Sequence, residues 1–170
     1  MSPARPDASE FAPFYARYVG LVPEAPLLDT LRAQPDAWER LLAGADPAAT
    51  YATDKWTVGQ VLTHVADTES VFAFRMLWFA RGGDPLPSFD QDAWAEVAPP
   101  ASVADGLAAF RSARAATVAL AESLGAEAWS RTGVASGHAM SARAAAYVLA
   151  GHVLAHIDVL RERYGIGGTD

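Results

Sequence analysis

The stretch SARAAAYVLAGHVLAHIDVLRERY, residues 141–164, contains no proline and predicts one long helix near the end of the chain. Within it, His152 and His156 are four residues apart, so their side chains project from one face, one turn apart. Two imidazoles in that arrangement can bind one metal ion. Two core histidines satisfied by hydrogen bonds would have the same spacing. The pair alone therefore does not distinguish a metal site from a hydrogen-bonded core pair. Apolar residues at helical spacing put the pair on or beside the buried face: Ala145, Val148, Leu149, Val153, Val159 and Leu160.

Length and composition predict one domain with a sizeable core, because the chain has 170 residues and is 51% hydrophobic. We expect a disordered tail over residues 1–10, a single domain over 11–165 and a second tail over 166–170. The formal net charge of −7 argues against nucleic acid and anionic membrane surfaces as partners. No signal peptide and no run of about 18 apolar residues is evident, which predicts a cytoplasmic protein. The absence of cysteine restricts any metal site to nitrogen and oxygen ligands.

Three further helices are predicted before the quoted stretch. The first runs from near Pro26 to about Ala43, and Pro35 is expected to kink or break it at Gln34. An apolar segment before it, residues 11–22, is expected to form a short helix or lid against the body.

The second helix has the clearest start, because Thr57 and Gln60 form a capping box. It is predicted to run to about Arg81, where two glycines follow. The third helix is predicted to open at Ser102 and to close at Gly125. The quoted stretch is the fourth helix, and its first serine is the expected cap.

Four helices and no convincing strand predict an all-α four-helix bundle. Residues 83–100 form a long connection without helical periodicity, long enough to travel the length of a helix of about 35 Å. We therefore expect the second and third helices to run parallel, in an up-down-down-up bundle with this crossover between them. The crossover is also placed to roof a site. Residues 126–140 are expected to be a loop that exposes His138.

His64 lies on the inward face of the second helix, by its spacing from Val61, Val65 and Thr68. In the expected bundle it lies about 10 Å from the start of its helix, and His156 lies about 12 Å from the end of its own. Because those two ends are adjacent, all three histidines can reach one level. Three histidines leave a coordination position for water or substrate. Zinc or nickel suits such ligands, with iron or manganese possible.

The chain resembles the DinB-like (damage-inducible) superfamily of metal-binding four-helix-bundle proteins. The resemblance rests on "YARYVGLVP" (15–23), "KWTVGQVLTHVADTESVFAFRML" (55–77), "FDQDAW" (89–94) and "GHVLAHIDVLRERYG" (151–165). It implies an up-down-down-up bundle, often dimeric, whose metal-binding histidines correspond to His64, His152 and His156. It also implies activity as a thiol S-transferase or a hydrolase for some members. Ala155 replaces a histidine found in the related ending GHxxHH, which spares both ligands.

Three charged residues on the second helix are weaker candidates. Asp67 and Glu69 follow His64 closely and can orient an imidazole or act as a general base, or simply be solvated. Arg75 can bind a substrate carboxylate, or pair with an acidic neighbour such as Glu69.

Two function classes fit these residues. The first is a metal-dependent enzyme whose ion activates a low-molecular-weight thiol or water for attack on a small-molecule substrate. Any such thiol would come from a cosubstrate, because the chain has no cysteine. The second is a non-catalytic stress-response module that binds a metal or small ligand.

Overall fold

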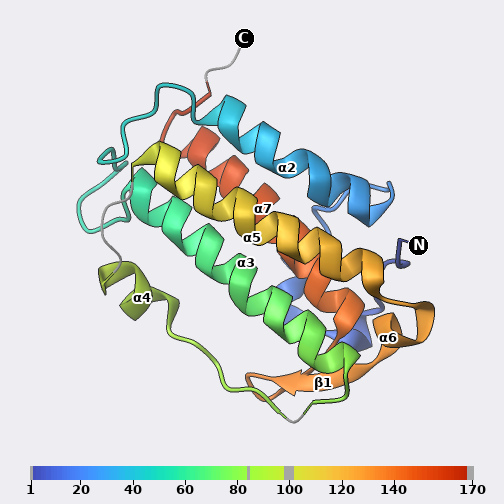
Figure 1. Cartoon of the computed structure of the whole chain (residues 1–170). Coiled ribbons are helices and arrows are strands. Elements are labelled where there is room, and N and C mark those ends of the chain that lie inside the picture. The colour runs from blue at the N-terminus through green and yellow to red at the C-terminus, as the bar shows by residue number, and fades with distance from the viewer. Residues whose placement is uncertain (1, 84, 98–101, 168–170) are drawn as a thin grey trace.

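The computed structural model describes residues 2–83, 85–97 and 102–167, and four long helices form its main body (Figure 1). These are α2 (Leu27–Leu41), α3 (Val58–Ala80), α5 (Val103–Ser123) and α7 (Ala142–Glu162). The helices α3 and α5 lie side by side and run in the same direction, whereas α2 and α7 run the opposite way. The predicted up-down-down-up bundle with a crossover after α3 is therefore confirmed.

Local capping signals place the starts of three of these helices. Gln60 N donates to Thr57 Oγ1 at 3.2 Å, and Thr57 N donates to Gln60 Oε1 at 2.8 Å, so the predicted capping box starts α3. Ser102 accepts a hydrogen bond from Asp105 N and starts α5. Ser141 accepts one from Ala144 N and starts α7.

The predicted break at Pro35 is wrong, because α2 continues through that residue. Proline has no N–H, so it leaves the carbonyl four residues earlier, that of Leu31, without its helical donor. Arg114 Nη1, from α5, donates to Leu31 O at 3.1 Å and supplies the missing hydrogen bond. A tertiary contact thus makes a proline inside the helix tolerable.

The two connections contain more regular structure than expected. The crossover includes a short helix, α4 (Gln91–Val97). The predicted loop over 126–140 instead contains α6 (Ala126–Ser130) and the strands β1 (Thr132–Ala135) and β2 (His138–Ser141), so the expectation of no strand is wrong here. The strands pair antiparallel through a two-residue turn, in which Ser136 and Gly137 have φ of 53° and 78°.

The crossover is tied to this hairpin by backbone hydrogen bonds. Leu86 N donates to Val134 O at 2.8 Å, and Ser136 N donates to Leu86 O at 3.2 Å. These bonds anchor the crossover at the end of α3, from where it returns along the bundle to the start of α5 (Figure 1).

Residues 2–10 of the predicted disordered tail have contacts with the body, whereas residue 1 lies outside the described residues. Arg5 donates to Val19 O at 2.6 Å and to Val22 O at 2.7 Å. Arg143 Nε, at the start of α7, donates to Glu10 Oε2 at 2.8 Å. The predicted lid is present as two short helices, η2 (Pro13–Tyr15) and α1 (Ala16–Val19), with α1 lying against α7.

At the other end, part of the expected tail also has contacts with the body. Ile166 N donates to Leu160 O at 3.1 Å, and Ile166 packs on the buried core. Residues 168–170 of the expected tail lie outside the described residues.

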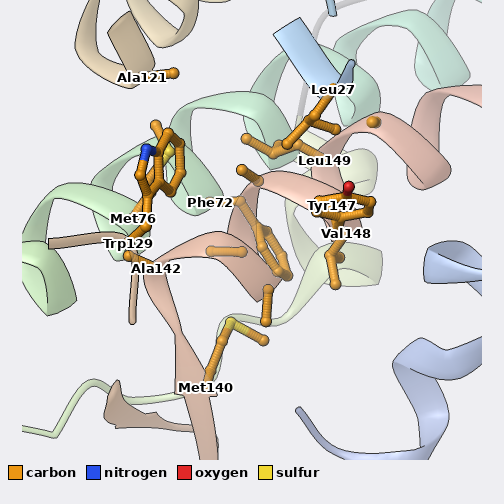
Figure 2. Packing of buried hydrophobic residues seen from close by; sticks show 14 of the residues in the cluster. Leu27, Phe72, Met76, Ala121, Trp129, Met140, Ala142, Tyr147, Val148 and Leu149 are labelled. Carbon is orange, nitrogen blue, oxygen red and sulfur yellow. The ribbon is translucent and has the colours of Figure 1, made fainter. Parts of the chain in front are cut away.

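The core consists of two apolar clusters, one in each half of the bundle. The first includes Phe72 and Met76 of α3 and Val148 and Leu149 of α7, as Figure 2 shows. The second gathers side chains from all four long helices in the other half: Trp38, Leu62, Phe110 and Leu160. Each cluster removes a large apolar area from water, which is the main stabilising contribution to the fold.

A buried polar network lies between the two clusters and connects all four long helices. Arg114 of α5 binds Glu69 of α3 through two hydrogen bonds, Nε to Oε1 at 2.7 Å and Nη2 to Oε2 at 2.8 Å. It also donates to Gln34 Oε1 of α2. Gln34 Nε2 in turn donates to Ala150 O of α7 at 2.7 Å. The charges are paired inside the protein, as buried charges must be.

Candidate metal centre

Three histidine side chains from two antiparallel helices meet beside this network. His64 lies on the buried face of α3, and His152 and His156 lie one turn apart on α7. His152 Nε2 lies 3.0 Å from His64 Nε2 and 3.1 Å from His156 Nε2. The three ligand atoms all lie within 4.8 Å of one another. The shared level expected from helix geometry is therefore present in the fold.

Burial keeps the three imidazoles neutral. Desolvation lowers the pKa of His64 to about 4 and that of His156 to about 3. It also lowers the pKa of His152 well below its usual value, with smaller contributions from the charges of the neighbouring histidines and Arg17. Neutral imidazole offers the lone pair that a metal ion requires. At neutral pH all three side chains are thus in the ligating form.

The contacts among the three nitrogens suit a cation better than they suit hydrogen bonds. Two Nε2 atoms face the single Nε2 of His152. A neutral imidazole nitrogen carries either one proton or one lone pair, so His152 Nε2 cannot form two good hydrogen bonds at once. Tetrahedral ligation by imidazole would hold the nitrogens about 3.3 Å apart, near the observed spacing. The donor set therefore fits one divalent ion.

The outer ring nitrogens differ in their surroundings. His64 Nδ1 lies 3.5 Å from Thr68 Oγ1 on the next turn of α3. His156 Nδ1 is buried and has no hydrogen-bond partner among the described residues. Asp67 is one of the residues expected to orient an imidazole. In the structure it is Thr68 that lies beside the His64 ring. Its spacing of four from His64 is the signal by which the sequence could have indicated it.

The histidines line a cavity of about 390 Å³ that also contains several aromatic side chains. Its walls come from η2 and α1, from α3 and α7, and from the crossover, which contributes Phe89 and Gln91 and so does roof the site. Arg17 is the one arginine or lysine among the described residues that line it, and no aspartate or glutamate does. The aromatic lining residues are Phe14, Tyr15, Tyr18, Trp56, Phe72 and Phe89.

Gly151 allows α1 to lie close against α7. A Cβ at this position would lie 1.9 Å from Tyr18 O, so only glycine permits this approach of the two backbones. The ring of Tyr18 then packs edge-on against the ring of His152, with centroids 5.4 Å apart. The sequence signal for this contact was a glycine inside a helical pattern, immediately before a ligand candidate.

The weaker candidates lie outside the cavity. Glu69 points into the bundle and pairs with Arg114, so of the two alternatives for Arg75 the pairing with Glu69 is wrong. Arg75 is buried and donates to Pro87 O at 3.4 Å and Ser136 Oγ at 3.3 Å. Asp67 is half-buried, and desolvation raises its pKa. None of these three residues is among those that line the cavity. His138 is exposed on β2, as predicted.

Comparison with known proteins now identifies the family. A sequence model of the DinB superfamily matches residues 27–160, which include all four long helices up to the last turn of α7. The chain belongs to the DinB superfamily. No curated protein matches this DinB-superfamily chain.

One solved structure supports the fold of this DinB-superfamily chain. It is YfiT from Bacillus subtilis, described as a probable metal-dependent hydrolase with an unusual four-helix bundle topology. The TM-score is 0.69 at 19% sequence identity, over 97% of this chain and 95% of that chain. At this identity the likeness establishes the fold. Among the described residues, no helix combines the length and apolar character needed to cross a membrane.

Proposed function

We propose that this DinB-superfamily chain is a metal-dependent enzyme that acts on a small molecule, with His64, His152 and His156 as the ligands of one divalent ion. The observation that carries the proposal is the convergence of three imidazoles, two buried and one half-buried, at the wall of a cavity. Three protein ligands with an adjoining open cavity are typical of a catalytic site, because the remaining coordination position faces the substrate.

The bound ion would act as a Lewis acid that lowers the pKa of a thiol or a water molecule towards neutrality. The aromatic side chains of the cavity wall would pack against the apolar part of a substrate. Any thiol must come from a cosubstrate, because the chain contains no cysteine. We propose zinc or nickel as the native ion, with iron or manganese as the less favoured choices for imidazole ligands.

The cavity favours a small-molecule substrate over a macromolecular one. Its volume of about 390 Å³ lies in the range of pockets that enclose small ligands. Polar side chains such as Arg17, Thr68 and Gln91 would orient a substrate beside the aromatic rings. Homodimer formation, which the family resemblance implies, stays a prediction.

One observation favours the alternative, a non-catalytic module that binds a metal or small ligand. Among the described residues that line the cavity there is no carboxylate to act as a general base. Asp67 and Glu69 would have to act from outside the cavity, and Glu69 is already paired. The enzyme proposal therefore relies mainly on the ion to activate the nucleophile, since Asp92, the carboxylate that acts electrostatically on His64, lines the adjoining pocket and not this cavity.

Metal content and turnover together test the proposal. Purified protein should bind up to one divalent ion per chain, and each of His64→Ala, His152→Ala and His156→Ala should sharply lower that occupancy. The exposed His138→Ala is the matched control and should retain full metal. Circular dichroism should show that every variant stays folded. Full occupancy in all three variants would place the site elsewhere.

The reaction class is decided with the fully metallated protein. A panel of small electrophiles is offered with and without a low-molecular-weight thiol, and a panel of small esters and amides is offered in water. Turnover that needs the thiol assigns S-transfer, and turnover without it assigns hydrolysis. Metal-bound, folded protein that turns over neither panel would contradict the enzyme proposal and favour the binding module.

A further inference from the structure

Arg17 is held at the edge of the cavity by two aromatic rings. Its guanidinium lies 4.0 Å from the centroid of the Phe14 ring and 4.6 Å from that of Tyr18. Its Nη2 also donates to Tyr18 Oη at 2.7 Å. Among the described residues no carboxylate pairs with Arg17, whereas Arg32, Arg111, Arg114 and Arg143 each bind at least one. The Arg17 guanidinium is thus held in place by the two rings, and several of its N–H donors remain available to a ligand.

The charges around the cavity favour an anion. The chain as a whole carries a net charge of −7, which repels anions from most of its surface. The described residues that line the cavity nevertheless include Arg17 and no acidic side chain. Asp92 lines the adjoining pocket with His156 and acts electrostatically on His64. Arg17 therefore makes its side of the cavity a favourable place for an anionic group on an otherwise acidic protein.

We propose that Arg17 binds an anionic group of the substrate, a carboxylate or a phosphate, while the apolar body of the substrate lies against the aromatic wall. This inference rests on the proposed function and names its substrate class: a small organic anion with an apolar body. Guanidinium groups bind both oxyanions through paired N–H donors. Tyr18 contributes by fixing the guanidinium, and Gly151 contributes by letting Tyr18 approach α7.

The experiment compares ligands of equal shape and different charge by isothermal titration calorimetry of the metallated protein. The pair is 3-phenylpropanoate and its neutral amide, 3-phenylpropanamide, and benzyl phosphate tests the second oxyanion. We expect the carboxylate to bind about tenfold or more tightly than the amide. Whichever of the two anions binds more tightly identifies the oxyanion that the site prefers.

Arg17→Met should abolish the preference for the anion while leaving the affinity for the amide and the metal content unchanged. Arg40→Met, an exposed arginine outside the cavity, is the matched control for the change in net charge and should keep the preference. Arg17→Lys should retain part of it, because the charge remains but the paired donors are lost. An undiminished preference in Arg17→Met would overturn the inference and assign anion binding to the metal ion.

Failure of this inference is distinguishable from failure of the proposed function. Loss of the preference in Arg17→Met, in a protein that turns over no substrate, would support the anion site and contradict the enzyme. Turnover that is equally fast for neutral and anionic substrates of the same shape would support the enzyme and contradict the anion site. Both outcomes are read from the same metallated preparations.

Discussion

At the residue scale, His152 is the side chain on which the centre depends most. Its Nε2 is the nitrogen that both other histidines approach, at 3.0 and 3.1 Å, and its ring packs against Tyr18. Its neighbour Gly151 allows that packing. One short segment of α7 therefore connects the three candidate ligands with the aromatic and cationic groups at the edge of the cavity.

Another residue-scale contact makes stability depend on pH. Arg143 and further hydrogen bonds lower the pKa of Glu10 from 4.5 to about 2. Because the folded-state pKa is the lower one, the stabilisation is fully present above about pH 4.5 and is lost as the pH falls towards 2. Glu10→Gln should thus lower the free energy of unfolding at pH 7 by about 1–2 kcal/mol.

Urea denaturation of both proteins between pH 7 and pH 3 checks this prediction. The difference between wild type and Glu10→Gln should narrow as the pH falls below 4.5, the ordinary pKa of the carboxyl group. Glu24→Gln removes a carboxylate whose side chain is 91% exposed, and it should have little effect at any pH. A difference that does not change with pH would mean that Glu10 stabilises the fold through packing and not through its charge.

At the element scale, the parallel pair α3 and α5 is held by a buried ion pair. The side chains of Arg114 and Glu69 are each 1% exposed. Glu69→Gln would leave the guanidinium buried without a counter-charge, and we expect a loss of about 3–5 kcal/mol in the free energy of unfolding. Replacing both residues by methionine should recover part of that loss, because the uncompensated charge is gone.

Arg111, another arginine of α5, provides the matched control for loss of an ion pair, because its pairs with α2 are exposed to solvent. Arg111 pairs with Asp36 and Glu39 at the surface, with its side chain 40% exposed. Arg111→Met should change stability little, because solvent screens exposed pairs. Urea denaturation of the wild type, Glu69→Gln, the double methionine variant and Arg111→Met measures these differences in the free energy of unfolding. A Glu69→Gln variant as stable as Arg111→Met would show that water or a rearranged partner reaches Arg114.

At the scale of the whole molecule, we expect the bundle to fold without a metal ion. Neither apolar cluster includes one of the three histidines, and the ion pair of Arg114 and Glu69 between the clusters is not hydrogen-bonded to them. Removal of the metal by a chelator should leave the helical circular dichroism signal intact at room temperature. The melting temperature should fall, because an ion that binds only the folded state adds to its stability. Loss of the helical signal on chelation would show instead that the ion is structural.

The sequence alone determined those features whose signals lie within a few residues. Capping residues such as Thr57 and Ser141 satisfy backbone groups one turn away, so the starts of α3 and α7 could be predicted. The spacing of His152 and His156 likewise fixes a common face, and the length of the crossover implies parallel helices. The helical rise per residue then predicted that His64 lies at the same level of the bundle as His152 and His156. In the structure the three side chains do lie together.

Only the tertiary structure decided the partners that come from distant parts of the chain. Pro35 is tolerated because Arg114 replaces its missing donor, and Glu69 pairs with Arg114 and not with Arg75. The place of Arg17 follows from the docking of α1 over Gly151. The physical reason is that hydrogen-bond partners, charge pairs and close backbone approaches depend on which faces pack together. That packing is a property of the whole bundle, and no local window of sequence contains it.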